Sequence, residues 1–252
     1  MTPPFDCALN GVSLSALDDR IAVLDLQEDS PKLRQVTAPS HPDGQRTICQ
    51  QRESLTIRVT FALHEPDVQQ RLQLLQQVRG WAEQGSTFTA SDHPGQQLTV
   101  LCTSLPGMSA DDWMAPLTVV FTAGRIPYWE DAVMTQHECS GASTFNVPGT
   151  AATTPVSVMV VNDGTTTVHH LTLRCGDSHM TFNGIDLPVN GFFLLTDTGS
   201  IQTAKVGGDS VLHCRTADSS DALLASCGKP CPVEAIADQP LRIIFMARGR
   251  YA

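Results

Sequence analysis

Two cysteines near the carboxyl end of the chain have a spacing that could support metal or redox chemistry. Cys227 and Cys231 are separated by three residues, and Cys214 with His213 or Cys175 could complete four tetrahedral zinc ligands. The pair is weak evidence, because the sequence contains no second tight pair of cysteines. The eight cysteines are scattered, unlike the dense framework of a small secreted domain, so free and mostly buried thiols are the favoured interpretation.

A second candidate is the loop Asp197-Thr198-Gly199-Ser200, which follows the apolar run Phe192-Phe193-Leu194-Leu195. It looks like the active-site loop of aspartic proteases, where two carboxylates share a proton and activate water. The chain would have to dimerise to supply a second aspartate. Because the sequence also lacks a later apolar strand ending in a bracing glycine, an acid protease remains only an alternative.

Two pairs of acids lie beside tryptophans, a combination seen in sugar-cleaving sites. Asp111-Asp112 precede Trp113, and Glu130-Asp131 follow Trp129. Glycosidase carboxyls lie on facing walls about 5–9.5 Å apart, whereas adjacent acids do not flank a bond. We therefore interpret both pairs as acids in solvated turns.

The adjacent histidines His169 and His170 would point to opposite faces of a strand and so could not share a metal. We find no phosphate-binding loop, no Gly-x-Ser-x-Gly elbow and no metalloprotease histidine pair. The sequence predicts no catalytic, cofactor-binding or metal-binding residue, and we expect a protein that is not an enzyme.

Composition narrows the class of protein further. Of the 252 residues, 41% are hydrophobic and 17% charged, which favours a globular chain with a sizeable core. The formal charge of −10 makes nucleic acid an unfavourable binding partner. No apolar stretch approaches the ~18–20 residues that span a bilayer, and residues 1–10 lack the features of a secretion signal. We expect synthesis in a cytoplasm and no membrane insertion.

The elements that would position these residues are mostly strands. Apolar residues occupy every second position from Leu55 to Leu63, which predicts a half-buried strand. An amphipathic helix is predicted near residues 66–84, ending at Gly85. Strand periodicity returns in 98–102 and 116–121, so the helix should pack on a largely antiparallel sheet. The predicted apolar face of the helix is formed by Val68, Leu72, Leu75, Val78 and Ala82.

Two stretches depart from this pattern. Ser30 to Asp43 is polar, contains three prolines and has little periodicity, which predicts an extended loop or arm. Residues 136–154 are rich in Ser, Gly, Ala and Thr, which indicates a domain boundary. The sequence predicts a first domain at 1–140 and a second at 141–252, where short strands and Asn-Gly or Asp-Gly turns favour a β-sandwich.

The order of features in the first half is more specific than any one feature. It resembles the amino-terminal domain of the distal tail protein family of long, non-contractile-tailed bacteriophages, and the second half fits the same family. The first-half features are Phe5, Leu9-Asn10-Gly11, Gly44-Gln45-Arg46, Arg52, Arg71, Trp81, Asp92-His93-Pro94-Gly95 and the stretch from Phe121 to Tyr128. Those of the second half are Asn162-Asp163-Gly164, Phe182-Asn183-Gly184, the strand ending at Asp197 and the stretch from Ile244 to Tyr251.

The resemblance implies a mostly β protein with an α+β first domain. A sandwich-like or barrel-like domain with one helix would form a ring of six copies, and a galectin-like or carbohydrate-module-like sandwich would project from it. The ring would join the tail tube to the tail-tip hub, with receptor-binding proteins as further partners and genomic DNA passing through the lumen. The chain would reside in the virion, after synthesis in the host bacterial cytoplasm.

Two hypotheses follow from this implied assembly. The Ser30 to Asp43 segment is a candidate arm between subunits, so deleting Pro31 to Pro42 should abolish ring formation. The second domain could instead bind a host saccharide, but it has no tryptophan to offer as an exposed flat ring. The aromatic residues that this domain offers for sugar stacking include Phe182, Phe192, Phe193, Phe245 and Tyr251.

Overall fold

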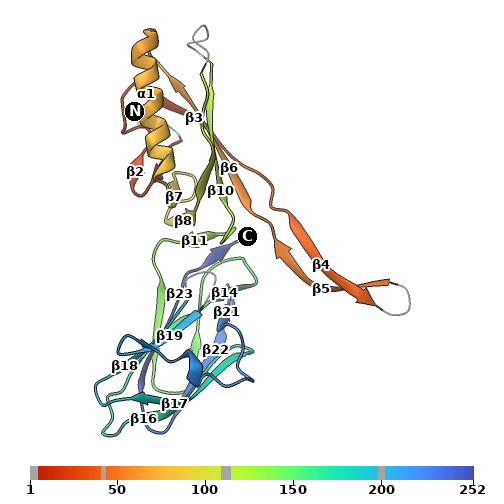
Figure 1. Cartoon of the computed structure of the whole chain (residues 1–252), viewed down its shortest axis with the longest axis vertical. Coiled ribbons are helices and arrows are strands. Elements are labelled where there is room, and N and C mark those ends of the chain that lie inside the picture. The colour runs from red at the N-terminus through yellow and green to blue at the C-terminus, as the bar shows by residue number, and fades with distance from the viewer. Residues whose placement is uncertain (1–4, 41–43, 109–114, 198–201) are drawn as a thin grey trace. The chain divides into compact units, whose positions relative to one another are not determined.

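The computed structural model describes residues 5–40, 44–108, 115–197 and 202–252, without the side chains of 38–40, 44–50 and 197. The chain divides into two compact units, unit 1 at Met1–Trp129 and unit 2 at Glu130–Ala252. Strands dominate both units, which confirms the mostly β fold predicted from the sequence (Figure 1). Within the described residues, no helix is long and apolar enough to cross a membrane.

Unit 1 is built around a four-stranded antiparallel sheet in which β6 and β10 are central. In β6 the predicted alternation is confirmed, since Ile57, Val59 and Phe61 are fully buried and the residues between them are not. One face of the sheet therefore carries the core, as strand geometry requires. The strand order is β3 (Ile21–Glu28), β6 (Leu55–Leu63), β10 (Leu117–Ala123), β9 (Leu101–Ser104).

A second sheet of short strands packs against this face through aromatic side chains. Phe88 of the second sheet lies 5.5 Å from Phe121 of β10, measured between ring centroids, and 6.2 Å from Trp129. Such tilted ring pairs add to the free energy gained by burial. The strands of unit 1 in this sheet are, in order, β2 (Val12–Ser13), β1 (Cys7–Leu9), β7 (Thr87–Ala90) and β8 (Gln96–Thr99).

The predicted helix is α1, Val68–Glu83. Its N-cap is Asp67, whose carboxylate accepts a hydrogen bond from the backbone N–H of Gln70 at 2.9 Å. The prediction that Val68 and Leu72 face the core is wrong, because both are more than a third exposed. The helix is rotated so that a buried arginine lies inside with the apolar residues. The buried face consists of Arg71, Leu74, Leu75, Val78, Trp81 and Ala82.

The segment Ser30 to Asp43, which the sequence predicted as an extended loop or arm, contains the strand β4 (Leu33–Ser40). This strand forms an antiparallel hairpin with β5 (Gly44–Arg52), which lies beyond the predicted arm. Among the described strands, these two pair only with each other. The hairpin continues the β3–β6 pair along the chain, as Figure 1 shows.

Unit 2 is a sandwich of two sheets over one core. Phe182 of one sheet contacts Phe193 of the other, with ring centroids 5.1 Å apart, and both are fully buried. The larger sheet has the order β12 (Thr135–Cys139), β23 (Arg242–Ala247), β15 (Ser157–Val161), β18 (Phe192–Asp197), β19 (Gln202–Val206), β20 (Asp209–Ser210). The smaller has the order β13 (Ser143–Phe145), β22 (Cys231–Ala237), β16 (Val168–Cys175), β17 (Ser178–Leu187).

Shorter elements complete unit 2. They are β14 (Thr153–Pro155), paired with β21 (Leu224–Ser226), the 3-10 helix η1 (Leu212–Cys214), and β24 (Arg250–Tyr251), which follows the last strand of the larger sheet. The strand β11 (Trp129–Asp131) spans the division between the units.

Candidate functional site

The candidate chemical residues do not converge on one site. No group of three or more His, Cys, Asp or Glu side chains that could hold a metal occurs within the described ranges. Cys231 contacts Cys175, with the two sulfur atoms 3.6 Å apart. Both belong to the buried core of unit 2, so this pair is not at an open pocket.

The protease candidate lies largely outside the described residues. Asp197 is the last residue of β18, where its backbone pairs with Gln202, and Thr198 to Ser200 lie beyond the description. Asp111, Asp112 and Trp113 also lie outside the described residues. No catalytic geometry can therefore be built on either candidate.

The second acidic pair is described, and the prediction of solvated turn acids is wrong for it. Glu130 accepts a hydrogen bond from Nε of Arg250 at 2.7 Å, and both side chains are nearly buried. Asp131 accepts one from the hydroxyl of Tyr251 at 3.0 Å. Burial, and then this contact, raises the pKa of Tyr251. These acids hold the chain's last strand to β11 within unit 2.

The histidine pair makes separate contacts on the surface of unit 2. Nδ1 of His169 lies 2.7 Å from Oδ1 of Asp186, and Nδ1 of His170 lies 2.6 Å from Oδ1 of Asn183. The backbone N–H groups of both histidines donate to Oδ2 of Asp238. Those two bonds hold the pKa of Asp238 below its usual range, because they stabilise the carboxylate. Both histidines lie in β16, where its register with β17 shifts, and their contacts are structural.

The feature with the clearest functional character is the β4–β5 hairpin. In the part of it whose side chains are described, Pro31 to Gln35, Thr37 and Gln51 are exposed, and Leu33 is 65% exposed. A lone two-stranded hairpin is at best marginally stable in water, so burial against another molecule would supply what the hairpin lacks. Sequence reasoning placed an arm here but missed its strands.

A charge signal in the sequence could have marked the hairpin. Four basic residues and one acidic residue lie between positions 31 and 52, in a chain whose formal charge is −10. A basic element on an acidic protein is electrostatically suited to an acidic surface of another copy. The five residues are Lys32, Arg34, Asp43, Arg46 and Arg52.

The base of the hairpin is held by several contacts within unit 1. The guanidinium of Arg58 forms an ion pair with Asp29 at 3.1 Å, and the N–H of Glu53 donates to the carbonyl of Lys32 at 2.8 Å. The guanidinium carbon of Arg52 lies 4.7 Å from the centroid of the Tyr128 ring. The hairpin is therefore oriented at its base, while most of its described side chains are exposed.

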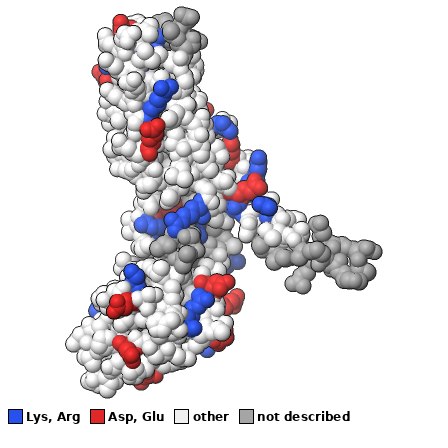
Figure 2. Space-filling model, viewed as in Figure 1, with Lys and Arg blue, Asp and Glu red and all other residues white. Residues whose placement is uncertain are grey.

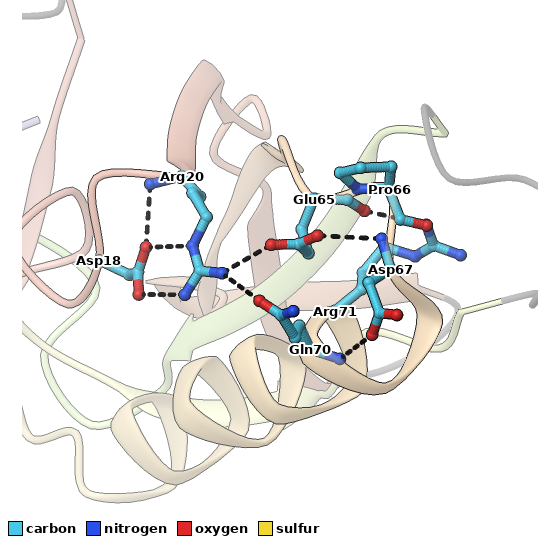
Figure 3. A network of polar contacts seen from close by, with 7 residues as sticks. All are labelled: Asp18, Arg20, Glu65, Pro66, Asp67, Gln70 and Arg71. Carbon is cyan, nitrogen blue, oxygen red and sulfur yellow. Dashed lines mark hydrogen bonds and ion pairs between the residues drawn. The ribbon is translucent and has the colours of Figure 1, made fainter.

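The start of α1 is fixed by a polar network (Figure 3). The guanidinium of Arg20 forms two hydrogen bonds of 2.8 Å with Asp18 and also donates to Glu65 at 2.6 Å and to Gln70 at 3.1 Å. Hydrogen bonding to Arg20 holds the pKa of Asp18 well below its usual range. Buried Arg71 donates to the carbonyl of Glu65 at 3.0 Å. The network ties the helix to the start of β3.

The outward face of α1 is almost without charge. Val68 and Leu72 are exposed and lie one turn apart among glutamines. Of the charged residues in this helix, Glu83 is exposed, Arg79 is half-buried and Arg71 is buried. Figure 2 shows one blue and one red cluster over this part of unit 1, in a surface that is otherwise mostly uncharged. Such a face suits contact between like-charged copies, since it adds no repulsion. Its glutamines are Gln69, Gln70, Gln73, Gln76 and Gln77.

Comparison with solved structures shows that this arrangement of sheets and helix is similar to the fold of a phage Dit protein. The solved structures that match include the SPP1 Dit (gp 19.1) protein, described as a paradigm of the hub adsorption apparatus in phages infecting Gram-positive bacteria. Its TM-score is 0.70 at 14% identity, and the match covers 97% of this chain and 98% of that one.

A second match is to a chain of the phage p2 baseplate in its activated conformation with Sr. The TM-score is 0.50 at 6% identity, with 97% of each chain covered. No protein-family model and no curated protein matches the chain. At these identities the likeness shows the fold, and it confirms the resemblance drawn from the sequence at that level.

Proposed function

We propose that the chain is a structural, non-enzymatic protein of a phage tail, a ring component at the distal end that joins the tail tube to the tail-tip hub. The observation that carries this proposal is the likeness to SPP1 Dit over almost the full length of both chains, across both units. A match to one unit alone would support only a shared domain.

On this proposal unit 1 closes a ring of six copies. Cyclic symmetry requires that one patch on each copy meets a different patch on the next. The β4–β5 hairpin supplies one patch, because its sequence is basic and its described side chains are mostly exposed. The uncharged face of α1, including Val68 and Leu72, offers a second surface without like-charge repulsion.

Unit 2 would be the galectin-like domain that projects from the ring and docks other tail proteins, receptor-binding proteins among them. Sugar binding is less favoured than docking. Phe182, Phe193 and Phe245 are fully buried, which leaves Phe192, 47% exposed, as the exposed large aromatic side chain of the described part of unit 2. The protein would reside in the virion, and the acidic chain suits a lumen through which DNA slides.

The mass of the purified chain in solution, measured by light scattering with negative-stain images, tests the proposal. We expect a hexamer of 27.2 kDa chains with a central hole. A chain that stays monomeric at high concentration would contradict self-assembly and favour a carbohydrate-binding module, which a glycan array would then test.

A deletion sharpens this test. Replacing residues 31–52 by a short glycine linker between Ser30 and Glu53 removes both hairpin strands and keeps the β3–β6 pair. We expect the variant to stay folded, with a cooperative thermal transition, and to lose the hexamer; its Tm should fall slightly, because the Arg52–Tyr128 contact and the assembly are lost. Leu101→Ser is a control, because Leu101 is 70% exposed on β9 and lies outside the deleted segment. Normal hexamers from the deletion variant would refute the hairpin as the contact.

A further inference from the structure

Two cysteines that lie 56 positions apart in the sequence meet in the core of unit 2. Cys175 ends β16 and Cys231 begins β22, two neighbouring antiparallel strands. Their sulfur atoms are 3.6 Å apart, and the side chains are 0% and 1% exposed. Because Cys175 is in register with Val233, Cys231 is its diagonal neighbour on the same inward face.

The two sulfur atoms are in van der Waals contact, the first requirement for a disulfide. A sulfur–sulfur bond is about 2.05 Å long, so the two atoms need to approach by roughly 1.5 Å, which small side-chain rotations can supply. The strands are already held in place at this point, since the N–H of Gly176 donates to the carbonyl of Pro232 at 2.8 Å. Diagonal neighbours on antiparallel strands lie about 7–8 Å apart, beyond the usual disulfide span of about 4.4–6.8 Å between Cα atoms, so closure also draws the ends of β16 and β22 slightly together.

We propose that Cys175 and Cys231 form an oxidisable dithiol that a peroxide closes to a disulfide, cross-linking β16 to β22. Sequence reasoning considered Cys231 with its near neighbour Cys227. The structure assigns Cys231 a partner on the adjacent strand, with which it is already in contact.

The reaction balances with one peroxide for each pair of thiols. One thiolate attacks an oxygen of hydrogen peroxide, forming a sulfur–oxygen bond and releasing hydroxide, which takes up the thiol proton as water. The second sulfur then attacks the sulfenic sulfur, a sulfur–sulfur bond forms, and the oxygen leaves as a second water. Both thiols are oxidised and the peroxide is reduced.

The surroundings of the dithiol set its rate. Burial, and then the neighbouring thiol of Cys231, raises the pKa of Cys175, so little thiolate is present at neutral pH. Closure should be slow in a reducing cytoplasm and faster at alkaline pH. On the proposed function, which this consequence rests on, the chain would be made with free thiols and cross-linked after particles are released into an oxidising exterior.

The experiment uses the full wild-type chain, purified with reductant, freed of it and exposed to hydrogen peroxide at mildly alkaline pH. Thiols that remain are alkylated in denaturant, and the digest is mapped by mass spectrometry. We expect a peptide that links Cys175 to Cys231, lost on reduction. The transition of unit 2 should also rise by roughly 10 °C in Tm on oxidation, because the cross-link closes a long loop.

Two variants act as controls. Cys227→Ala should form the same link, whereas Cys175→Ala should show neither the link nor the rise in Tm. Recovery of both Cys175 and Cys231 as alkylated thiols from the wild type would overturn the proposal, as would Cys231 linked to Cys227. Because this assay needs no assembly, a missing disulfide overturns the dithiol, while a missing hexamer overturns the proposed function.

Discussion

The β4–β5 hairpin continues the β3–β6 pair, and the two halves of this ribbon differ in how far their side chains are buried. The β3–β6 pair is the inner half and the β4–β5 pair is the outer half. In the inner half, β6 buries every second residue, with Ile57, Val59 and Phe61 fully buried. The outer half, β4 and β5, has strands of similar length, yet its described side chains are mostly exposed. Strand pairing and core formation are therefore separate properties, since the described part of the outer half is paired but has no buried side chain.

The difference can be sharpened by truncating one large side chain in each half. Phe61→Ala should lower the free energy of unfolding of unit 1 by about 3–5 kcal/mol, because a fully buried ring is replaced by a cavity. Urea denaturation of the full chain measures this loss.

Leu33→Ala is the matched substitution in the outer half. Leu33 is 65% exposed in the single chain, so in the dissociated monomer its truncation should change the free energy of unfolding by less than about 0.5 kcal/mol. Equal losses at the two positions would show that the hairpin is covered within the monomer, and the comparison would fail.

The same contrast explains what could be predicted from the sequence. β6 and α1 were predictable because each has one face in the core, and burial of one face imprints a period of two or 3.6 on the residues. The hairpin has no such face, so its prolines and polar residues predicted an arm without strands. The bulge between Val36 and Thr37 weakens the pattern further.

Contacts between distant strands escaped prediction for another reason. Cys175 meets Cys231 because β16 and β22 pair in one particular register, which the sequence does not state.

The inward face of α1 was misassigned because Arg71, a charged residue, lies inside. Its donors are satisfied locally, by the carbonyl of Glu65 among others, and a pattern of apolar positions cannot anticipate that.

A smaller effect is expected where α1 begins. Asp67→Ala removes the side chain that caps the helix, so the N–H of Gln70 loses its partner. We expect a loss of about 1 kcal/mol in the free energy of unfolding. Urea denaturation measures it, and Asp67→Asn, which can still accept the bond, should recover most of the loss. A loss as large as that of Phe61→Ala would contradict a purely local role.

The smallest effect concerns the carboxylate of Asp18, which is partly exposed beside Arg20. Its pKa in the folded protein lies below the ordinary value of 3.8, chiefly because Arg20 donates hydrogen bonds to the charged form. A lowered pKa stabilises the fold above the unfolded value and loses that contribution as the pH falls below it. Asp18→Asn should therefore lower the Tm of unit 1 near neutral pH, and the difference from wild type should shrink as the pH falls below 3.8.

Thermal unfolding of wild type and Asp18→Asn over a series of pH values gives this difference directly. Asp25→Asn, which changes an exposed acid of β3, is the control, and its Tm should follow that of the wild type throughout. A gap between wild type and Asp18→Asn that stays constant down to low pH would mean that the asparagine disturbs packing. A gap that closes would show that the acid-sensitive contact is the Asp18–Arg20 pair, which lies where β3 meets α1 and not in the β4–β5 hairpin.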